Sequence, residues 1–172
     1  PLAVRQPDFF ESRGPAWVGY LLRDIFRLGQ MTNQVIAWPN PDPIVQDIVT
    51  QKVAEKQPYI WRLSRLGLVA AEKGNGLNFL SEVSQLIWSG EPWSEGTVLA
   101  DATALAGLNL SEIEAKTLGH EDTLDARLAQ HDADLRAAGH WGVPTCVING
   151  EPFFGMDRLQ VLEWRLDEMG IA

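Results

Sequence analysis

The chain has 172 residues, enough for one ordinary domain or for one domain that carries an insertion. Hydrophobic residues make up 45% of it and charged residues 22%, which allows a sizeable core and argues against disorder. The formal net charge of -9 opposes binding to nucleic acid or to an anionic membrane, because phosphate contacts need clustered lysine and arginine.

Helical periodicity and proline spacing describe the first part of the chain. Residues 1–14 show no apolar period and predict a loop. From Pro15 to about Met31, apolar residues recur at three- and four-residue steps, which predicts an amphipathic helix. Residues 38–43, Trp-Pro-Asn-Pro-Asp-Pro, predict a rigid loop, because each proline fixes a φ angle and lacks a backbone donor.

Helical patterns dominate the middle of the chain. One pattern runs from 44 to 73; we expect Pro58 to break or kink it, and Gly74-Asn-Gly76 predicts its end. Further helices are predicted at 77–88, at 94–106 with Ser94 as the cap, after Asn109 or Ser111, and at 121–138.

The pattern changes to strands near the C-terminus. Residues 143–148, Val-Pro-Thr-Cys-Val-Ile, form a β-branched apolar run, and Asn149-Gly150 is a strong signal for a hairpin turn. Residues 151–154 predict the return strand. Asp157 is then expected to cap a final helix.

A Val-Pro-Thr sequence entering a strand, followed by a two-residue turn, a second strand and a helix, resembles the C-terminal half of a thioredoxin fold. The resemblance implies a cis bond between Val143 and Pro144, a geometry that X–Pro bonds adopt far more easily than other peptide bonds. It also implies an unpaired backbone N–H and C=O at Val143, to which a thiol peptide can add as a short strand. We therefore expect an α/β, thioredoxin-like (DsbA-like) fold with a large all-helical insertion, mostly helical in this chain.

Residues 154–158, Phe-Gly-Met-Asp-Arg, resemble the aromatic-Gly-(Asn/Ser)-Asp-Arg segment of the 2-hydroxychromene-2-carboxylate isomerase and kappa-class glutathione transferase family. In that family this turn opens a helix and binds the γ-glutamyl end of glutathione, and a helix N-terminus suits a carboxylate. The resemblance implies a glutathione site made of Val143, Pro144, Phe154, Gly155, Met156 and Asp157. Met156 replaces the family's polar residue, so one side-chain hydrogen bond is lost.

A second match lies near the start of the chain. Residues 20–27, Tyr-Leu-Leu-Arg-Asp-Ile-Phe-Arg, with the later Trp38-Pro-Asn, resemble the first insertion helix and the following loop of the same family. That loop helps to build the family's pocket for a small aromatic substrate, which implies a pocket role for Trp38 and Asn40. Asn40 follows Pro39 directly, a one-residue shift from the family's pattern.

The family places its catalytic serine just after an N-terminal strand, and we expect that segment to precede Pro1. No catalytic residue is therefore assigned, and no serine of this chain replaces it. The resemblance divides the chain into an N-terminal loop at 1–14, a helical insertion at 15–138, and the thioredoxin hairpin and helix at 139–172. Without the preceding strands, we expect the edge of the strand at 145–148 to pair with a second copy, giving a homodimer, or to be covered by residues 1–14.

Cys146 is the one cysteine of the chain, so neither an internal disulfide nor a CxxC motif is present. This favours a reducing compartment, the cytoplasm. Its place in an apolar strand predicts a buried structural thiol. His140 is expected to stabilise its loop or to contact a substrate, whereas His120 and His131 are expected on the surface. No spacing predicts a metal site, and no apolar stretch approaches the ~20 residues of a membrane span.

Three functional hypotheses follow. The first is a glutathione-dependent isomerase or transferase acting on an aromatic or polyketide-like carbonyl compound, with the glutathione thiolate as nucleophile. The second is a DsbA-like thiol-disulfide oxidoreductase, which needs a CxxC motif on the expected preceding segment. The third is a non-catalytic binding or assembly protein without the active-site strand, which is what the chain would be if it were the complete protein.

Overall fold

A computed structural model describes Val4, residues 15–47, Thr50 and residues 52–171. The chain divides into two compact units, Pro1–Glu121 and Asp122–Ala172. The division predicted at 138/139 lies at the far end of helix α8 (Glu121–Ala137) and stays a prediction. Across the described part of the chain, no helix combines the length and the apolar character needed to cross a bilayer.

The first unit begins with α3 (Pro15–Thr32), which confirms the predicted amphipathic helix. The proline loop after it is held by Trp93, which lies far later in the sequence. The Trp93 side chain is fully buried, and its Nε1 donates a hydrogen bond to the Pro41 carbonyl oxygen at 2.7 Å. The loop is thus fixed to the helical core by one aromatic side chain.

The helix predicted at 44–73 is wrong in its first half, because the described residues from 44 to 57 are not helical. The buried side chain of Gln57 holds this segment as a loop. Its Oε1 accepts from the Val45 N–H at 2.9 Å, and its Nε2 donates to the Val45 carbonyl oxygen at 2.8 Å. Pro58 does not kink a helix but begins one, since the first helical position needs no N–H.

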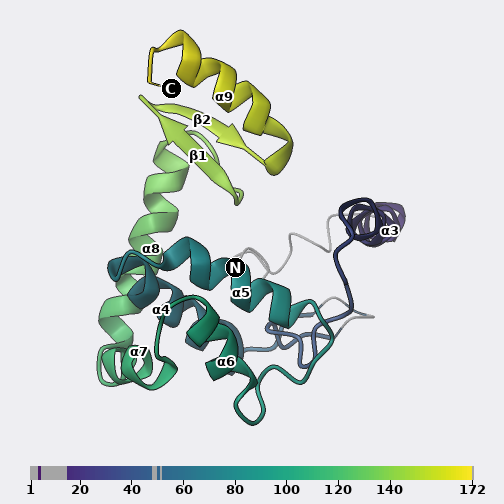
Figure 1. The fold of residues 1–172 in the computed structure, drawn as a ribbon, viewed down its shortest axis with the longest axis vertical. Helices are drawn as coiled ribbons and strands as arrows, with labels where there is room; N and C mark the ends of the chain where they lie inside the picture. Colours follow the sequence, from purple (N-terminus) through teal and green to yellow (C-terminus); the bar gives the residue numbers. More distant parts are fainter. Residues whose placement is uncertain (1–3, 5–14, 48–49, 51, 172) are drawn as a thin grey trace. The chain divides into compact units, whose positions relative to one another are not determined.

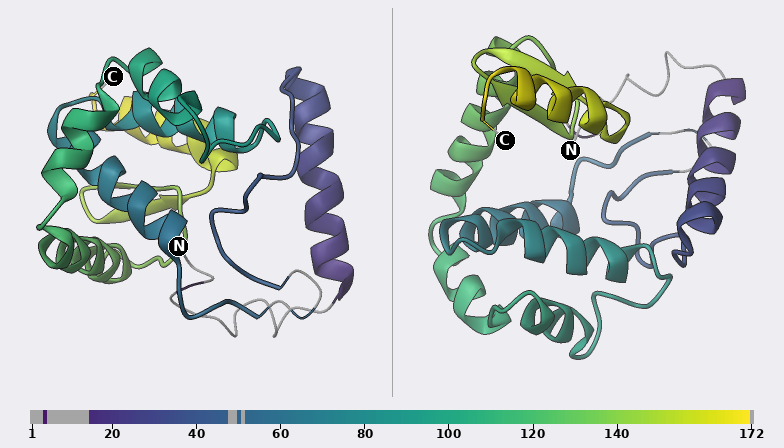
Figure 2. Two further views of the ribbon diagram at one scale, coloured as in Figure 1. Left: turned by 90° about the horizontal axis from the view of Figure 1, so that it is seen from below. Right: turned by 45° about the horizontal axis from the view of Figure 1, so that its top comes forward.

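Helices α4 to α7 form the core of the first unit (Figures 1 and 2). They are α4 (Pro58–Glu72), α5 (Gly76–Ile87), α6 (Val98–Leu105) and α7 (Leu110–Thr117). Helix α4 packs against α5 and α7, and α6 packs against α5 and α7. Among the described residues of this unit, the buried apolar side chains include those of Leu63, Leu66, Leu68, Val69, Ala70, Phe79, Val83, Ile87, Trp93, Leu99, Ala102, Ala106 and Ile113.

Of the two predicted helix caps, the one at α7 is confirmed and the one at α6 is wrong. Asn109 caps α7 as expected, since its side chain accepts from the Glu112 N–H at 3.2 Å. Ser94 does not cap α6, because that helix begins only at Val98, after Thr97. The residues between Ser94 and Val98 form turns instead.

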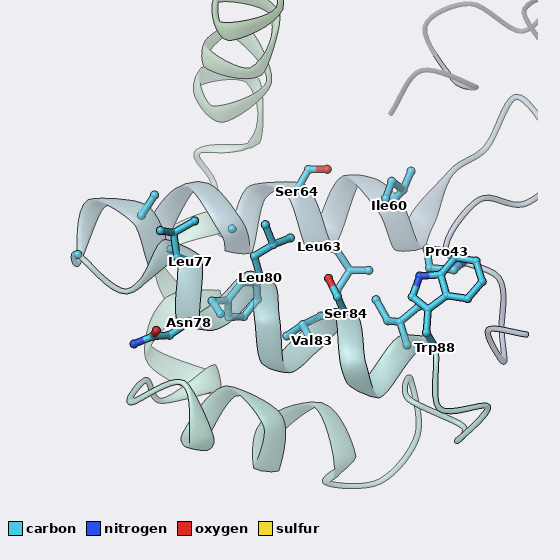
Figure 3. A pocket seen from close by; sticks show the side chains of 16 residues that line it. Pro43, Ile60, Leu63, Ser64, Leu77, Asn78, Leu80, Val83, Ser84 and Trp88 are labelled. Carbon is cyan, nitrogen blue, oxygen red and sulfur yellow. The ribbon is translucent and has the colours of Figure 1, made fainter. Parts of the chain in front are cut away.

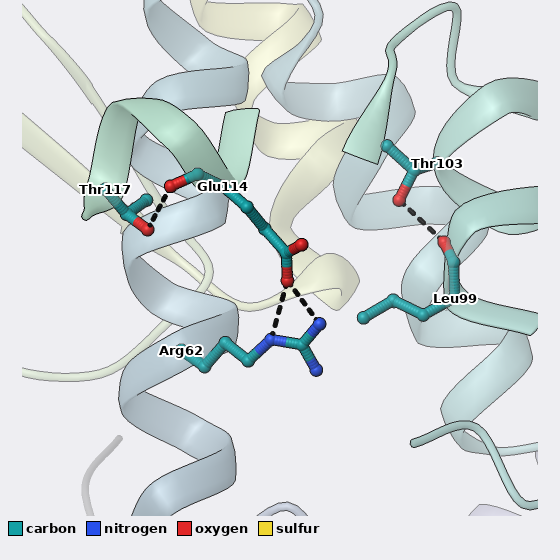
Figure 4. A network of polar contacts seen from close by, with 5 residues as sticks. All are labelled: Arg62, Leu99, Thr103, Glu114 and Thr117. Carbon is teal, nitrogen blue, oxygen red and sulfur yellow. Dashed lines mark hydrogen bonds and ion pairs between the residues drawn. The ribbon is translucent and has the colours of Figure 1, made fainter. Parts of the chain in front are cut away.

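Polar contacts connect or terminate the same helices (Figure 4). Arg62 on α4 holds Glu114 on α7: its Nε donates to Glu114 Oε1 at 3.0 Å and its Nη2 donates to the same oxygen. Both side chains are 40% exposed, so this pair is worth at most about 1 kcal/mol. The buried Thr103 hydroxyl donates to the Leu99 carbonyl oxygen at 2.7 Å, which satisfies the only polar atom of its side chain inside the core.

The second unit contains most of α8, an antiparallel hairpin and a final helix. The hairpin is β1 (Thr145–Ile148) and β2 (Glu151–Phe154), as predicted, with Thr145 opposite Phe154. Asn149 and Gly150 form its turn with φ angles of 49° and 82°, the left-handed values that a two-residue hairpin turn requires. A short 3₁₀ turn, η1 (Met156–Arg158), leads into α9 (Leu159–Glu168), which packs against β2 (Figure 1).

β1 pairs with β2 on one side only, and no other strand of the described residues pairs with it. The expectation that a second copy covers the open edge therefore stays a prediction. The alternative cover, residues 1–14, lies outside the described residues apart from Val4.

Candidate functional site

The loop that leads into β1 carries the predicted cis bond between Val143 and Pro144, which confirms that expectation. Val143 is 72% exposed. Among the described residues, no hydrogen bond uses the backbone N–H or C=O of Val143. One donor and one acceptor are therefore available to an external peptide group at this position.

The turn after β2 supplies further donors beside this loop. Gly155 has a φ of 98° and donates its N–H to the Pro144 carbonyl oxygen at 2.9 Å. That N–H is therefore not available to a ligand, so Gly155 does not donate a backbone hydrogen bond to glutathione as a member of the implied site would. The N–H groups of Met156 and Asp157 take part in none of the hydrogen bonds among the described residues, so they can donate outward.

Asp157 does not cap the final helix, which corrects the expected role. Helix α9 begins at Leu159 after Arg158, and neither η1 nor α9 has a side-chain capping bond. The Asp157 carboxylate is exposed and lies 3.1 Å from Arg158 Nη1. A Cβ at Gly155 would lie 2.5 Å from Asp157 Oδ1, so the carboxylate occupies the space that only glycine leaves.

Three aromatic rings, those of His140, Trp141 and Phe154, contact one another beside the end of β2. The His140 ring stacks on Phe154 with centroids 4.1 Å apart and planes 20° apart. The Trp141 ring stacks on His140, with centroids 5.4 Å apart and planes 16° apart. The Phe154 ring thus supports the His140 ring and remains partly exposed. His140 stabilises its loop, which was one of the two roles expected for it.

Cys146 is exposed, so its expected burial is wrong. Its side chain lies on the strand face toward α9, beside Phe153, Leu159 and Leu162, around a hollow of about 20 Å³. The prediction of a strand at this position is confirmed, but the two-stranded sheet does not enclose the thiol. The hollow is large enough for about one water molecule and too small for glutathione.

Trp38 and Asn40 lie in the first unit, whereas the six residues of the implied glutathione site lie in the second. Both are exposed. The Trp38 ring meets Trp88 edge-on at 6.0 Å. The Asn40 carbonyl oxygen accepts from the Trp93 N–H at 3.2 Å, so the backbone of Asn40 holds the loop. Their pocket role stays a prediction.

Sequence reasoning missed an apolar groove of about 830 Å³ between α4 and α5 (Figure 3). Its lining is Pro43, Ile60, Leu63, Ser64, Gly67, Ala71, Gly74, Gly76, Leu77, Asn78, Phe79, Leu80, Val83, Ser84, Ile87 and Trp88. None of these residues is charged, and the volume is that of a small-molecule site. Leu77 and Leu80 are exposed apolar residues on its rim, and they were the sequence signal for a second apolar face on α5.

Within the described ranges, no cluster of three or more His, Cys, Asp or Glu side chains is placed to hold a metal ion.

Comparison with known families supports the thioredoxin-like fold. A family model described as a DSBA-like thioredoxin domain matches residues 20–167. A search of curated proteins gives no match. The match begins within α3 and ends within α9, so the expected fold class is confirmed: a mostly helical, thioredoxin-like α/β fold. The chain belongs to the family of DSBA-like thioredoxin domains.

Proposed function

We propose that this chain binds glutathione at Val143 and at the Met156–Asp157 turn, as part of a glutathione-dependent isomerase or transferase. The observation that carries the proposal is the set of unpaired backbone groups: the N–H and C=O of Val143, and the N–H groups of the turn. The hydrogen bond between Gly155 and Pro144 links the two segments and keeps these groups near one another. A peptide with a free carboxylate and an amide backbone is complementary to such a surface.

Each residue has a distinct part in this proposal. Val143 pairs with the cysteinyl backbone of the tripeptide as a short added strand. The N–H groups of Met156 and Asp157 donate to the γ-glutamyl carboxylate, and the Asp157 carboxylate accepts from the γ-glutamyl ammonium. When bound, glutathione supplies a thiol whose thiolate form is a nucleophile. We assign binding and orientation of the tripeptide to these residues, and no activation of its thiol.

Asp157→Asn tests the glutathione site. The substitution removes the negative charge but keeps the size of the side chain, so binding should weaken by about 1–3 kcal/mol, the cost of one charged hydrogen-bond partner. Asp167→Asn, an equal charge change at an exposed position of α9, is the matched control. Calorimetry with reduced glutathione should separate the two variants, and equal affinities for both would count against the site.

The groove in the first unit suits the second substrate. Its uncharged, mostly apolar lining offers no cationic partner to a carboxylate, so a neutral aromatic or polyketide-like carbonyl compound fits it better than an anion. Ser64 and Ser84 lie on facing helices of the groove and offer hydroxyl donors to a carbonyl oxygen (Figure 3).

Gly67 gives a direct test of the groove. This residue lies inside α4 on the groove wall, and a Cβ there would meet no atom within 4 Å. Gly67→Leu should therefore narrow the groove and weaken binding of 1-acetonaphthone, a neutral aromatic ketone. Gly19→Leu, which places the same side chain in open space on α3, is the control. Unchanged titrations of the ketone into the Gly67 variant would exclude the groove as its site.

Thiol-disulfide exchange is the alternative, because it also belongs to the DSBA-like family and because Cys146 is exposed. With one cysteine, these residues can form only a mixed disulfide. Incubation with glutathione disulfide would join the Cys146 sulfur to one glutathione and release the other as a thiol. A stable adduct of this kind favours exchange, whereas binding of reduced glutathione that persists in Cys146→Ser favours the transferase or isomerase.

A further inference from the structure

Side chains hold both polar groups of the Gly142 backbone. The Gly142 N–H donates to His140 Nδ1 at 2.9 Å, and the Gly142 carbonyl oxygen accepts from the Thr145 hydroxyl at 2.6 Å. Gly142 lies in a loop between α8 and β1, where no helix or strand ladder supplies these partners. Two side chains therefore supply the hydrogen-bond partners that a helix or strand would supply to its own backbone.

The bond from Thr145 acts on Val143 directly. The Gly142 C=O and the Val143 N–H belong to the same planar peptide unit, which is trans, so the two groups point in opposite directions. When the Thr145 hydroxyl fixes the direction of the Gly142 carbonyl, it also fixes the direction of the Val143 N–H. On the far side, the bond from Gly155 to the Pro144 carbonyl oxygen fixes the peptide unit after Pro144.

The bond from His140 acts one peptide unit earlier. The His140 ring is itself held by its stack on Phe154, and a Cβ on Gly142 would lie 2.5 Å from Phe154 Cε2 and 3.0 Å from His140 Cε1. Gly142 is thus pressed against two rings and cannot shift toward them. Because Nδ1 accepts a hydrogen bond, the proton of the neutral ring is on Nε2.

We propose that Thr145 and His140 are positioning residues that hold the Val143 N–H in the direction a bound peptide needs. The inference rests on the proposed binding of glutathione at Val143 and adds the residues that prepare that site. The unpaired groups of Val143 are flanked by peptide units that side chains or backbone already hold. Binding then costs less conformational entropy, because the loop need not be ordered by the ligand.

Conservative pairs of variants separate positioning from general stability. Thr145→Val removes the hydroxyl and keeps the shape, whereas Thr145→Ser keeps the hydroxyl. His140→Phe keeps the ring and removes the acceptor, whereas the side-chain oxygen of His140→Asn can accept from an N–H two residues later. His131→Phe, at an exposed position of α8, is the control.

The measurement is the affinity for reduced glutathione by calorimetry, together with the amide resonance of Val143 in the free full chain. We expect Thr145→Val and His140→Phe to weaken binding about fivefold, as the loss of one hydrogen bond implies, and Thr145→Ser and His140→Asn to restore it. We also expect the Val143 amide resonance to move in Thr145→Val and to stay in Thr145→Ser.

Two results would overturn the inference. One is equal affinity in Thr145→Val and Thr145→Ser, both shown to be folded by circular dichroism. The other is a Val143 amide resonance that is the same in both variants. If the wild-type chain does not bind glutathione, the proposed function fails, and the resonance of Val143 alone decides whether Thr145 positions this peptide unit.

Discussion

Glu151 on β2 and Arg165 on α9 form a two-point ion pair that joins the hairpin to the final helix. Arg165 Nε donates to Glu151 Oε2 at 3.0 Å, and Arg165 Nη2 donates to Glu151 Oε1. The Arg165 side chain is 34% exposed and that of Glu151 45%, so solvent screens the pair in part. The contact connects β2 and α9, the two elements that flank the Met156–Asp157 turn, and it therefore stabilises the ends of this turn.

Acidification should weaken this connection. The hydrogen bond from Arg165 lowers the pKa of Glu151 below its ordinary value of 4.5. A carboxyl whose folded pKa is lowered stabilises the fold above the ordinary pKa, and this contribution is lost as the pH falls through the lowered value. We expect the free energy of unfolding to fall below about pH 4.5 with a slope that Glu151→Gln reduces.

Urea denaturation at a series of pH values measures that slope. Glu163→Gln, at an exposed position of α9, provides the matched control and should keep the wild-type slope. If Glu151→Gln and Glu163→Gln show the same dependence on pH, the pair does not contribute to acid stability.

Gly155→Ala should destabilise the chain by about 1–3 kcal/mol. Its φ of 98° and ψ of 153° lie in a region that is almost restricted to glycine, and an added Cβ would meet Asp157 Oδ1 at 2.5 Å. The clash with the carboxylate can be separated from the backbone cost by a double-mutant cycle with Asp157→Ala, measured by chemical denaturation. Gly150→Ala, at another positive φ but with no atom within 4 Å, should show no coupling to Asp157→Ala. A cycle without coupling at Gly155 would mean that the carboxylate moves freely.

Gly67→Ala and Gly76→Ala should change stability in opposite directions. At Gly67, inside α4, a methyl group meets nothing and replaces the least favourable helix residue after proline, so we expect a gain of about 0.5–1 kcal/mol. At Gly76, the first residue of α5, a Cβ would lie 2.9 Å from the Ala71 Cα, and we expect a loss of about 1–3 kcal/mol. Thermal unfolding measures both. A loss of stability in Gly67→Ala would show that the groove is not open at this wall.

Local signals in the sequence were sufficient for the hairpin. The Asn149-Gly150 pair fixes the turn by its own backbone preferences, and the β-branched run and the Val-Pro-Thr motif lie within a few residues of it. The unpaired groups at Val143 followed from the same motif. The amphipathic helix at 15–32 was likewise predictable, because its period of apolar residues needs no distant partner.

The errors arise where distant residues decide the structure. Residues near 44–57 carry a helical apolar period, but the Gln57 side chain bonds the Val45 backbone twelve positions earlier and holds a loop. Cys146 is exposed because the number of strands and covering helices, not the strand sequence, sets burial. The groove depends on how α4 and α5 pack against each other. Asp157 does not cap α9 because a 3₁₀ turn, η1, lies between the end of β2 and the start of that helix.

The most direct test of the account is an amide NMR titration of the full chain with reduced glutathione. We predict saturable shifts at the amides of Val143, Met156 and Asp157, the three donors without a partner among the described residues. Cysteinylglycine, which lacks the γ-glutamyl group, should shift Val143 and leave Met156 and Asp157 in place. Saturable shifts confined to other residues, or none at millimolar glutathione, would contradict the proposed site.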